Sequence, residues 1–125
     1  MIFGIGTDIV HIKRMRDSLE KYGDKFARRI LTEREFSEFS NKQDKAAYLA
    51  KRFAAKEATA KAMGTGFSNG LSLQHIGVIN DEAGKPELEL LEVAEKFLQD
   101  NKIKQTYLSL ADEKDYAVAF VTLGL

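Results

Sequence analysis

Apolar residues in the first half of the chain recur mostly at helical spacing. An apolar stretch comes first, at about residues 2–8, and we expect it to form a strand. The residues that then recur every three or four positions are Ile12, Met15, Leu19, Tyr22, Phe26 and Ile30. Gly23 interrupts this run, so the pattern predicts two consecutive helices rather than one.

Two more helices are expected before residue 64. Thr32 and Glu35 have the spacing of a capping box, which predicts a short helix beginning there. Asp44 is suited to be the N-cap of the main helix, over about 45–63, and Gly64 suits the left-handed position that ends it. The main helix is rich in alanine, which favours helix and lets a neighbouring element pack closely.

The second half of the chain changes to a period of two. Residues 76–79 and 86–91 read as two strands joined by a turn at 81–85, which is a hairpin pattern. The remaining expected elements are an amphipathic helix over 91–101, strands over 106–111 and 116–123, and a charged loop over 112–115. The order β-α-α-α-α-β-β-α-β-β predicts an α+β fold with a mostly antiparallel sheet packed on a long central helix.

Composition limits the class of protein. A chain of 125 residues predicts a single domain over 1–125, and no apolar run approaches the roughly 20 residues of a membrane span. The N-terminus lacks the layout of a secretory signal, so we expect a cytoplasmic location. The absence of cysteine excludes disulfides, thiolate catalysis and cysteine-bound zinc. With only two isolated histidines, a metal would be held by oxygen ligands, which favours magnesium, calcium or manganese.

The net charge of zero hides an asymmetry. Residues 1–63 contain 14 Lys and Arg against 9 Asp and Glu, whereas residues 64–125 contain 5 against 10. The cations are densest between residues 13 and 29, where they are suited to attract an acidic partner. Interspersed acids allow the alternative that this is an ordinary solvated helix surface.

The main helix carries a candidate site. Phe53, Glu57 and Lys61 fall along one face of it at helical spacing, and Gly64 follows. A carboxylate and an ammonium one turn apart, next to flexible backbone, suit a metal and a phosphate. The alternative is a surface Glu–Lys pair followed by an ordinary glycine helix stop.

A second candidate lies in the first strand. Asp8 is expected at its end, well placed to reach into a cleft, or else to cap a turn or helix. Gly4 and Gly6 suit close backbone approach to a neighbour or a ligand. They lie within the strand and lack the third glycine of a dinucleotide-binding fingerprint, so we exclude that fold.

Four blocks in this order carry a family resemblance. Residues 4–10, 52–62, 64–66 and 84–86 resemble the signature blocks of holo-[acyl-carrier-protein] synthases, the short bacterial type of 4'-phosphopantetheinyl transferase. The resemblance covers essentially the whole chain. It implies the 4'-phosphopantetheinyl transferase fold, with Mg²⁺-dependent transfer of phosphopantetheine from coenzyme A to a serine of apo acyl carrier protein, in support of fatty acid biosynthesis. Adenosine 3',5'-bisphosphate would be released.

The resemblance also implies roles for individual residues. Asp8 and Glu57 would bind the metal, and Glu57 and Lys61 would act in catalysis. The residues expected to bind coenzyme A are Lys61, Gly64, Thr65 and Gly66 at its phosphates, and Gly84, Lys85 and Pro86 toward its nucleotide end. The cations expected to dock the acidic carrier protein are Arg14, Lys21, Lys25 and Arg28. The family is usually homotrimeric, with sites at subunit interfaces.

One position departs from the family pattern. Many members carry a histidine where Ser109-Leu110-Ala111-Asp112 ends here in an aspartate. Asp112 is either an outer magnesium-binding group or a turn residue, and we favour the turn. The identity of the group that accepts the serine proton therefore stays open.

Two other classes compete with the enzyme. A nucleic-acid-binding module would use the basic residues 13–29, but the late strands offer only scattered aromatics and the isoelectric point is near 6.7. We therefore expect no nucleic-acid partner and no membrane partner. An interaction protein would explain the charge asymmetry, but not the acids at positions 8 and 57.

Overall fold

The computed structural model describes all 125 residues in the predicted order of elements. The helices are α1 (Ile12–Tyr22), α2 (Asp24–Ile30), α3 (Glu33–Phe39), α4 (Lys45–Met63) and α5 (Val93–Asp100), with a 3-10 turn η1 (Leu73–His75) that was not predicted. The strands are β1 (Ile2–His11), β2 (Ile76–Asn80), β3 (Pro86–Leu90), β4 (Gln105–Asp112) and β5 (Tyr116–Gly124). The predicted α+β class is confirmed.

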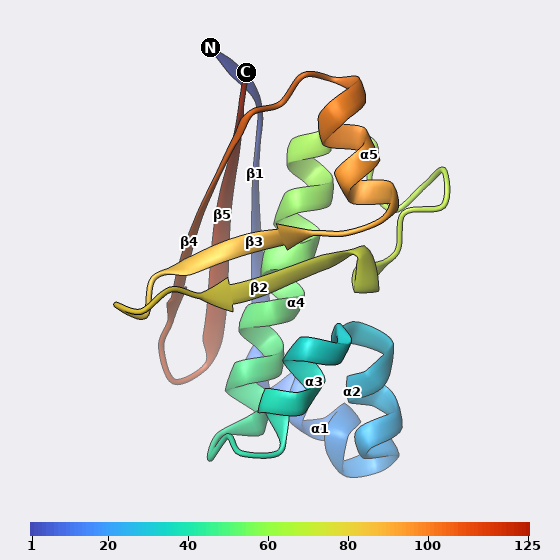
Figure 1. Cartoon of the computed structure of the whole chain (residues 1–125). Helices are drawn as coiled ribbons and strands as arrows, with labels where there is room; N and C mark the ends of the chain where they lie inside the picture. The colour runs from blue at the N-terminus through green and yellow to red at the C-terminus, as the bar shows by residue number, and fades with distance from the viewer.

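The strands form two separate sheets rather than one. One sheet has three antiparallel strands in the order β1-β5-β4, and the other is the β2-β3 hairpin. Figure 1 shows the hairpin crossing one side of α4 while the three-stranded sheet covers another side. The alternating pattern predicted each strand, but it does not say which strands share hydrogen bonds.

Helix α4 is the centre of the molecule. It runs between the three-stranded sheet and the hairpin, with α1, α2 and α3 gathered at its N-terminal end (Figure 1). Most of its residues are buried, including all of its alanines. A helix that is buried on most sides must have small or apolar side chains all round, which explains this composition.

The predicted helix ends are confirmed. The hydroxyl of Thr32 accepts a hydrogen bond from the Glu35 amide at 3.2 Å, and the Glu35 carboxylate accepts one from the Thr32 amide at 2.9 Å. The carboxylate of Asp44 caps α4 by accepting from the Ala47 amide at 3.0 Å. Gly64 ends α4 with a φ of 82°, in the left-handed region.

Strand β1 lies against α4 with no side chains between the two backbones. A Cβ added to Gly4 would lie 2.0 Å from the carbonyl oxygen of Ala62, and one added to Gly6 would lie 1.9 Å from that of Ala58. Both glycines are therefore required by space, as the sequence predicted for a close backbone approach. β1 also continues to His11, so the prediction that Asp8 ends the strand was wrong.

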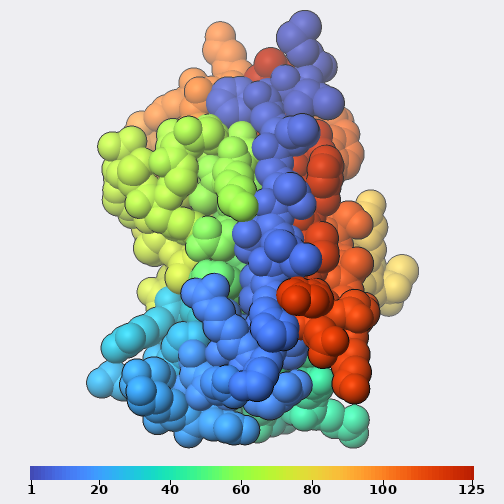
Figure 2. Space-filling model, turned by 180° about the vertical axis from the view of Figure 1, so that it is seen from behind, coloured from blue at the N-terminus to red at the C-terminus, as the bar shows by residue number.

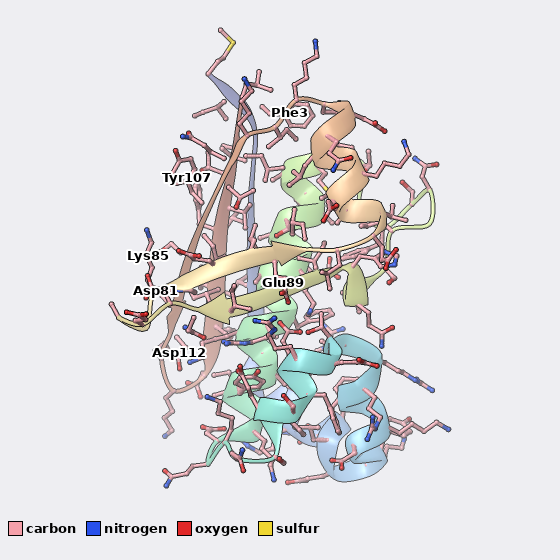
Figure 3. The ribbon with its side chains drawn as sticks, in the orientation of Figure 1. Phe3, Asp81, Lys85, Glu89, Tyr107 and Asp112 are labelled. Atoms are coloured by element: carbon pink, nitrogen blue, oxygen red, sulfur yellow. The ribbon has the colours of Figure 1, made fainter.

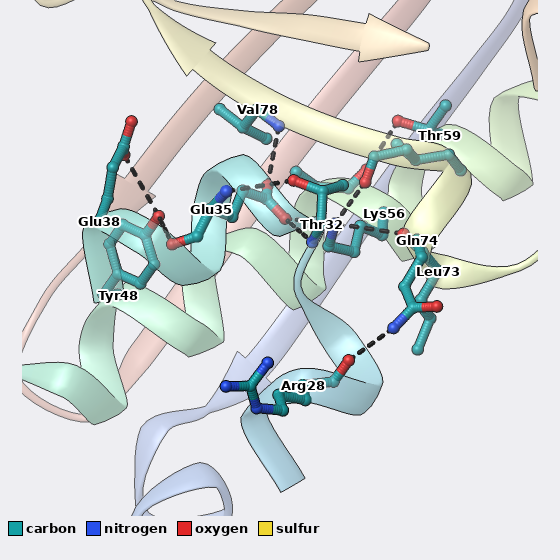
Figure 4. A network of polar contacts seen from close by, with 12 residues as sticks. Arg28, Thr32, Glu35, Glu38, Tyr48, Lys56, Thr59, Leu73, Gln74 and Val78 are labelled. Atoms are coloured by element: carbon teal, nitrogen blue, oxygen red, sulfur yellow. Dashed lines mark hydrogen bonds and ion pairs between the residues drawn. The ribbon is translucent and has the colours of Figure 1, made fainter. Parts of the chain in front are cut away.

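A buried ion pair ties α3 to α4 (Figure 4). The ammonium of Lys56 lies 2.7 Å from the Glu35 carboxylate, and both side chains are almost completely buried. Lys56 also donates to the carbonyls of Leu73 and Ile76, while Glu35 accepts from the Val78 amide at 2.8 Å. Because each charged group has several partners, the pair fixes α3, α4 and β2 to one another.

The three-stranded sheet has one buried and one exposed face. Side chains alternate along each strand, so every second residue faces α4 and the others face away from it. Large apolar side chains on the outer face remain exposed: Ile5 57%, Ile9 64%, Tyr107 52% and Phe120 46%. Figure 2 views the molecule from this side, where β1 and β5 run next to each other.

None of the helices combines the length and the apolar character needed to cross a bilayer.

Candidate active site

Asp8, Glu57 and Lys61 come together where β1 lies along α4. The ammonium of Lys61 lies 3.1 Å from a carboxylate oxygen of Asp8, and it donates to the carbonyl of Thr7 at 3.0 Å. The Asp8 side chain is only 16% exposed, whereas Lys61 is 54% exposed. The structure thus brings the Asp8 carboxylate and the Lys61 ammonium together on one accessible surface formed by β1 and α4, which we call the wall.

Local periodicity explains why these side chains meet. In β1, Gly4, Gly6 and Asp8 share the face that points toward α4, because alternate residues lie on the same side of a strand. In α4, Glu57 and Lys61 are one turn apart on the same helix face. The missing side chains at the two glycines bring the Asp8 carboxylate within reach of both.

The negative charge of Glu57 is only partly offset by its neighbours. Partial burial of the side chain raises the pKa of its carboxyl, and the negative charge of Asp8 raises it further. The charges of Lys61 and Arg14 act in the opposite direction but do not cancel the rise in this pKa. Two neighbouring acids that resist simultaneous ionisation form a place where a cation is favourable.

The donor set fits a magnesium ion. Asp8 and Glu57 offer carboxylate oxygens only, and no group of three or more His, Cys, Asp or Glu side chains gathers anywhere in the chain. Mg²⁺ is usually held by one or two carboxylates together with water and substrate phosphate oxygens. Two acids beside the exposed ammonium of Lys61 are consistent with that mode of binding.

The turn that follows α4 uses most of its amides internally. The N–H of Gly64 donates to the carbonyl of Lys61 at 3.0 Å, and the N–H of Gly66 donates to that of Ala60 at 3.3 Å. These two hydrogen bonds close the helix end, so the N–H groups of Gly64 and Gly66 are not free to bind a phosphate. Thr65 lies between them on the surface, and its N–H makes no hydrogen bond within the chain.

The turn holding Gly84, Lys85 and Pro86 is not part of this wall. Asp8 pairs with Ala119 of β5, which pairs with Leu110 of β4, so β1 and β4 are opposite edges of the sheet. The β2-β3 hairpin contacts the β4 edge, and its tip, with Asp81 and Lys85, extends beyond that edge (Figure 3). Within one chain, the two predicted parts of the coenzyme site are therefore separated by the sheet.

The predicted docking cations are exposed but do not form one cluster. The guanidinium of Arg14 lies 5.8 Å from the centre of the Phe53 ring on α4, on the side of Glu57. The guanidinium of Arg28 instead lies 3.9 Å over the Phe36 ring of α3. Lys21 and Lys25 are exposed on α1 and α2. Arg14 is the member that lies next to the candidate site.

Asp112 is the last residue of β4, where it pairs with Ala117. Its carboxylate lies 3.6 Å from the ammonium of Lys51. The turn that follows is organised by Glu113, whose carboxylate accepts from the amides of Asp115 and Tyr116 at 2.8 Å. The predicted loop over 112–115 therefore begins one residue later, at Glu113, and the placement of Asp112 in it was wrong.

Sequence reasoning missed Arg52 and Asn80. Arg52 stood in a motif block without a role, yet its guanidinium donates to the Asn80 side chain at 3.0 Å. Its place in a motif block was the only signal in the sequence, because its partner is 28 positions away and no periodicity connects the two.

Comparisons with known proteins point to one family. The sequence model of the 4'-phosphopantetheinyl transferase superfamily matches residues 4–121. The holo-[acyl-carrier-protein] synthase of Nitrosococcus oceani is 55% identical over 123 residues, covering 98% of this chain and 80% of that protein. The synthase of Hamiltonella defensa is 50% identical over 120 residues, covering 96% and 95%.

Solved structures agree with the sequence relatives. The crystal structure of holo-[acyl-carrier-protein] synthase from Neisseria meningitidis has a TM-score of 0.95 and 46% identity, with complete coverage of both chains. The enzyme from Bacillus anthracis, solved in complex with CoA (3',5'-ADP), has a TM-score of 0.83 and 38% identity, covering 98% of this chain and 96% of that one.

Proposed function

The chain belongs to the holo-[acyl-carrier-protein] synthase family of the 4'-phosphopantetheinyl transferases, and from that premise we propose its reaction. The enzyme transfers 4'-phosphopantetheine from coenzyme A to a serine hydroxyl of apo acyl carrier protein. The serine oxygen forms a bond to the β-phosphorus, the diphosphate bond breaks, and adenosine 3',5'-bisphosphate leaves. The observation that supports this best is the meeting of Asp8, Glu57 and Lys61 on one accessible wall.

We propose that Asp8 and Glu57 hold Mg²⁺ during this reaction. When bound, the ion would neutralise charge on the diphosphate of coenzyme A. The raised pKa of Glu57, caused by burial and then by the charge of Asp8, supports a cation at this position. Lys61 is paired with Asp8 in the free protein, and a cation at the acids would release it toward the phosphates.

Phosphoryl transfer asks for positioning and charge rather than covalent help. The exposed ammonium of Lys61 stabilises negative charge as the bisphosphate leaves. The unused N–H of Thr65 is suited to bind a phosphate oxygen between Gly64 and Gly66. A carboxylate that holds Mg²⁺ is a poor base, so the serine proton is not assigned to Glu57.

We propose a homotrimer whose sites lie between subunits. The turn with Gly84, Lys85 and Pro86 lies beyond the β4 edge of the sheet, whereas Asp8 and Glu57 lie at the β1 edge. If the β4 edge of one subunit meets the β1 edge of the next, the turn and the acids join in one site. The exposed apolar residues of the outer sheet face, among them Ile9 and Phe120, support burial between copies. The number three comes from the family resemblance.

Complementation between subunits tests this arrangement. Glu57→Gln and Lys85→Ala each damage a site on a different side of the interface. Coexpression of the two variants should restore activity, because some sites then take Glu57 from a Lys85→Ala subunit and Lys85 from a Glu57→Gln subunit. Mixed oligomers with no more activity than the single variants would contradict the interfacial site, and light scattering would give the subunit number.

The carrier protein would bind at the basic surface beside the acids. Arg14 lies nearest to Glu57 and is the docking cation with the strongest support, with Lys21, Lys25 and Arg28 farther along α1 and α2. A role in fatty acid biosynthesis follows from the modification of acyl carrier protein. The cytoplasmic location stays a prediction, which fractionation of cells making the tagged protein would test.

One incubation tests the reaction class. Apo acyl carrier protein, coenzyme A and Mg²⁺ should give a carrier mass increased by one phosphopantetheine. Glu57→Gln should abolish the gain without unfolding the protein, while Glu95→Gln, exposed on α5, should keep full activity. Near-normal turnover of Glu57→Gln with Mg²⁺ would refute the assignment of this carboxylate.

A further inference from the structure

The turn between β2 and β3 is ordered by its own backbone and by Asp81. The Asp81 carboxylate accepts from the amides of Ala83 and Lys85, both at 2.9 Å. The N–H of Gly84 donates to the carbonyl of Asp81 at 2.9 Å, and Gly84 has a φ of 87°. These contacts fix the shape of the turn, but they do not fix its position relative to α4, because all of them lie within the turn.

Asn80 supplies that missing connection. Its side-chain oxygen accepts from the Arg52 guanidinium at 3.0 Å, and its side-chain nitrogen donates to the carbonyl of Gly84 at 2.9 Å. A guanidinium only donates and a carbonyl only accepts, so the two contacts require an amide at position 80. One side chain thus bridges the central helix and the turn.

Arg52 is a firm anchor for this bridge. It is 5% exposed, and its guanidinium lies 4.3 Å over the ring of Tyr48. Tyr48 is itself held by a hydrogen bond of 3.2 Å from its hydroxyl to the backbone carbonyl of Glu35. The Nε of Arg52 has no partner, so the contact with Asn80 carries much of its hydrogen bonding. Because α4 also carries Glu57 and Lys61, the bridge fixes the position of the turn relative to that part of the candidate site.

We propose that Asn80, held by Arg52, is a positioning residue that sets where the 84–86 turn meets the nucleotide end of coenzyme A. The inference rests on the proposed function, in which that turn contacts the nucleotide. Neither side chain touches the reacting atoms in this proposal. Asn80 limits the turn to one position before the substrate binds, and so lowers the ordering cost of binding.

Binding of two ligands tests the proposal with the whole protein. The probes are coenzyme A and adenosine 3',5'-bisphosphate, measured by calorimetry for wild type, Asn80→Leu and the control Ala83→Ser. Asn80 and Ala83 are both exposed, and the Ala83 side chain lies at the tip of the turn. We expect Asn80→Leu to weaken both ligands about tenfold, and the control to change affinity less than twofold.

Kinetics and exchange separate positioning from a loss of structure. Asn80→Leu should raise KM for coenzyme A while kcat and KM for the carrier protein stay close to wild type, even though the lost contact with buried Arg52 lowers the melting temperature. Amide exchange at residues 83–85 should become faster. A second variant, Arg52→Met, should give the same rise in KM, and the double variant should be no worse than either single one, because both act through one bridge.

The outcomes are distinct. Equal affinity of wild type and Asn80→Leu for both ligands would overturn the positioning role and leave the proposed function intact. Additive losses in the double variant would also overturn it. A wild-type protein that binds neither ligand would overturn the proposed function and this inference together.

Discussion

The contact between Gly6 and α4 gives the sharpest prediction. In Gly6→Ala, the new methyl carbon would lie 1.9 Å from the carbonyl oxygen of Ala58 and 2.7 Å from the amide nitrogen of Ala62. Carbon and carbonyl oxygen approach to about 3.3 Å, so β1 has to retreat from α4 by about 1.4 Å. No flexible side chain can relieve the clash, because both contacted atoms belong to the helix backbone.

Two losses follow from that displacement. Overpacking of a core contact costs roughly 1–3 kcal/mol, and a backbone clash belongs at the upper end of that range. For a chain of this size, about 3 kcal/mol lowers the melting temperature by about 10 °C. Asp8 is two residues along the same strand, so its carboxylate moves away from Glu57. A misplacement of about 1 Å can reduce catalysis about 100-fold.

Transfer of phosphopantetheine and thermal unfolding measure the two losses separately. Gly124→Ala is the matched control, because its methyl carbon would meet its nearest atom at 3.6 Å, an ordinary contact in the same sheet. It should keep activity and lose little stability. Gly6→Ala with near-normal melting and turnover would refute the claim that backbone contact between β1 and α4 sets the position of Asp8.

Three further predictions concern charged groups. Lys56→Met should destabilise the fold by about 3–5 kcal/mol in urea unfolding, because the Glu35 charge stays buried without its partner. Adding Glu35→Gln should recover part of this lost stability, and no recovery would argue against a charge effect. Without metal, Glu57→Gln should stabilise the protein at pH 8 but not near pH 4. Burial raises the pKa of Glu57, so the folded state disfavours the charged carboxylate at pH 8, whereas at low pH the carboxyl is neutral in both the folded and the unfolded state. Urea unfolding in chelator at both pH values would check the sign. Arg14→Glu should raise KM for the carrier protein about tenfold and change KM for coenzyme A little, whereas equal effects would argue against docking.

Local patterns were enough to predict the elements of the fold. The capping box at Thr32, the N-cap at Asp44 and the stop at Gly64 depend on residues close in sequence, so their spacing alone identifies them. The division into two sheets was missed, because pairing of β1 with β5 joins residues more than 100 positions apart. The end of β1 was also misplaced, since the ladder with β5 continues past Asp8 to His11.

The candidate site shows the same division between local and distant information. Glu57 and Lys61 were placed on one face by helix periodicity, and the meeting with Asp8 required the close contact that Gly4 and Gly6 allow. The bridge from Arg52 to Asn80 was beyond reach, because it depends on where the hairpin crosses α4. The separation of Lys85 from the acids likewise depends on strand order, which short motifs do not encode.

The contact of main chain with main chain between β1 and α4 has a consequence for how this enzyme can change. At this seam any side chain at position 4 or 6 would meet the backbone of α4, so these two positions admit only glycine. Adaptation to different carriers would instead fall on the exposed cations of α1 and α2, where side chains are free to differ.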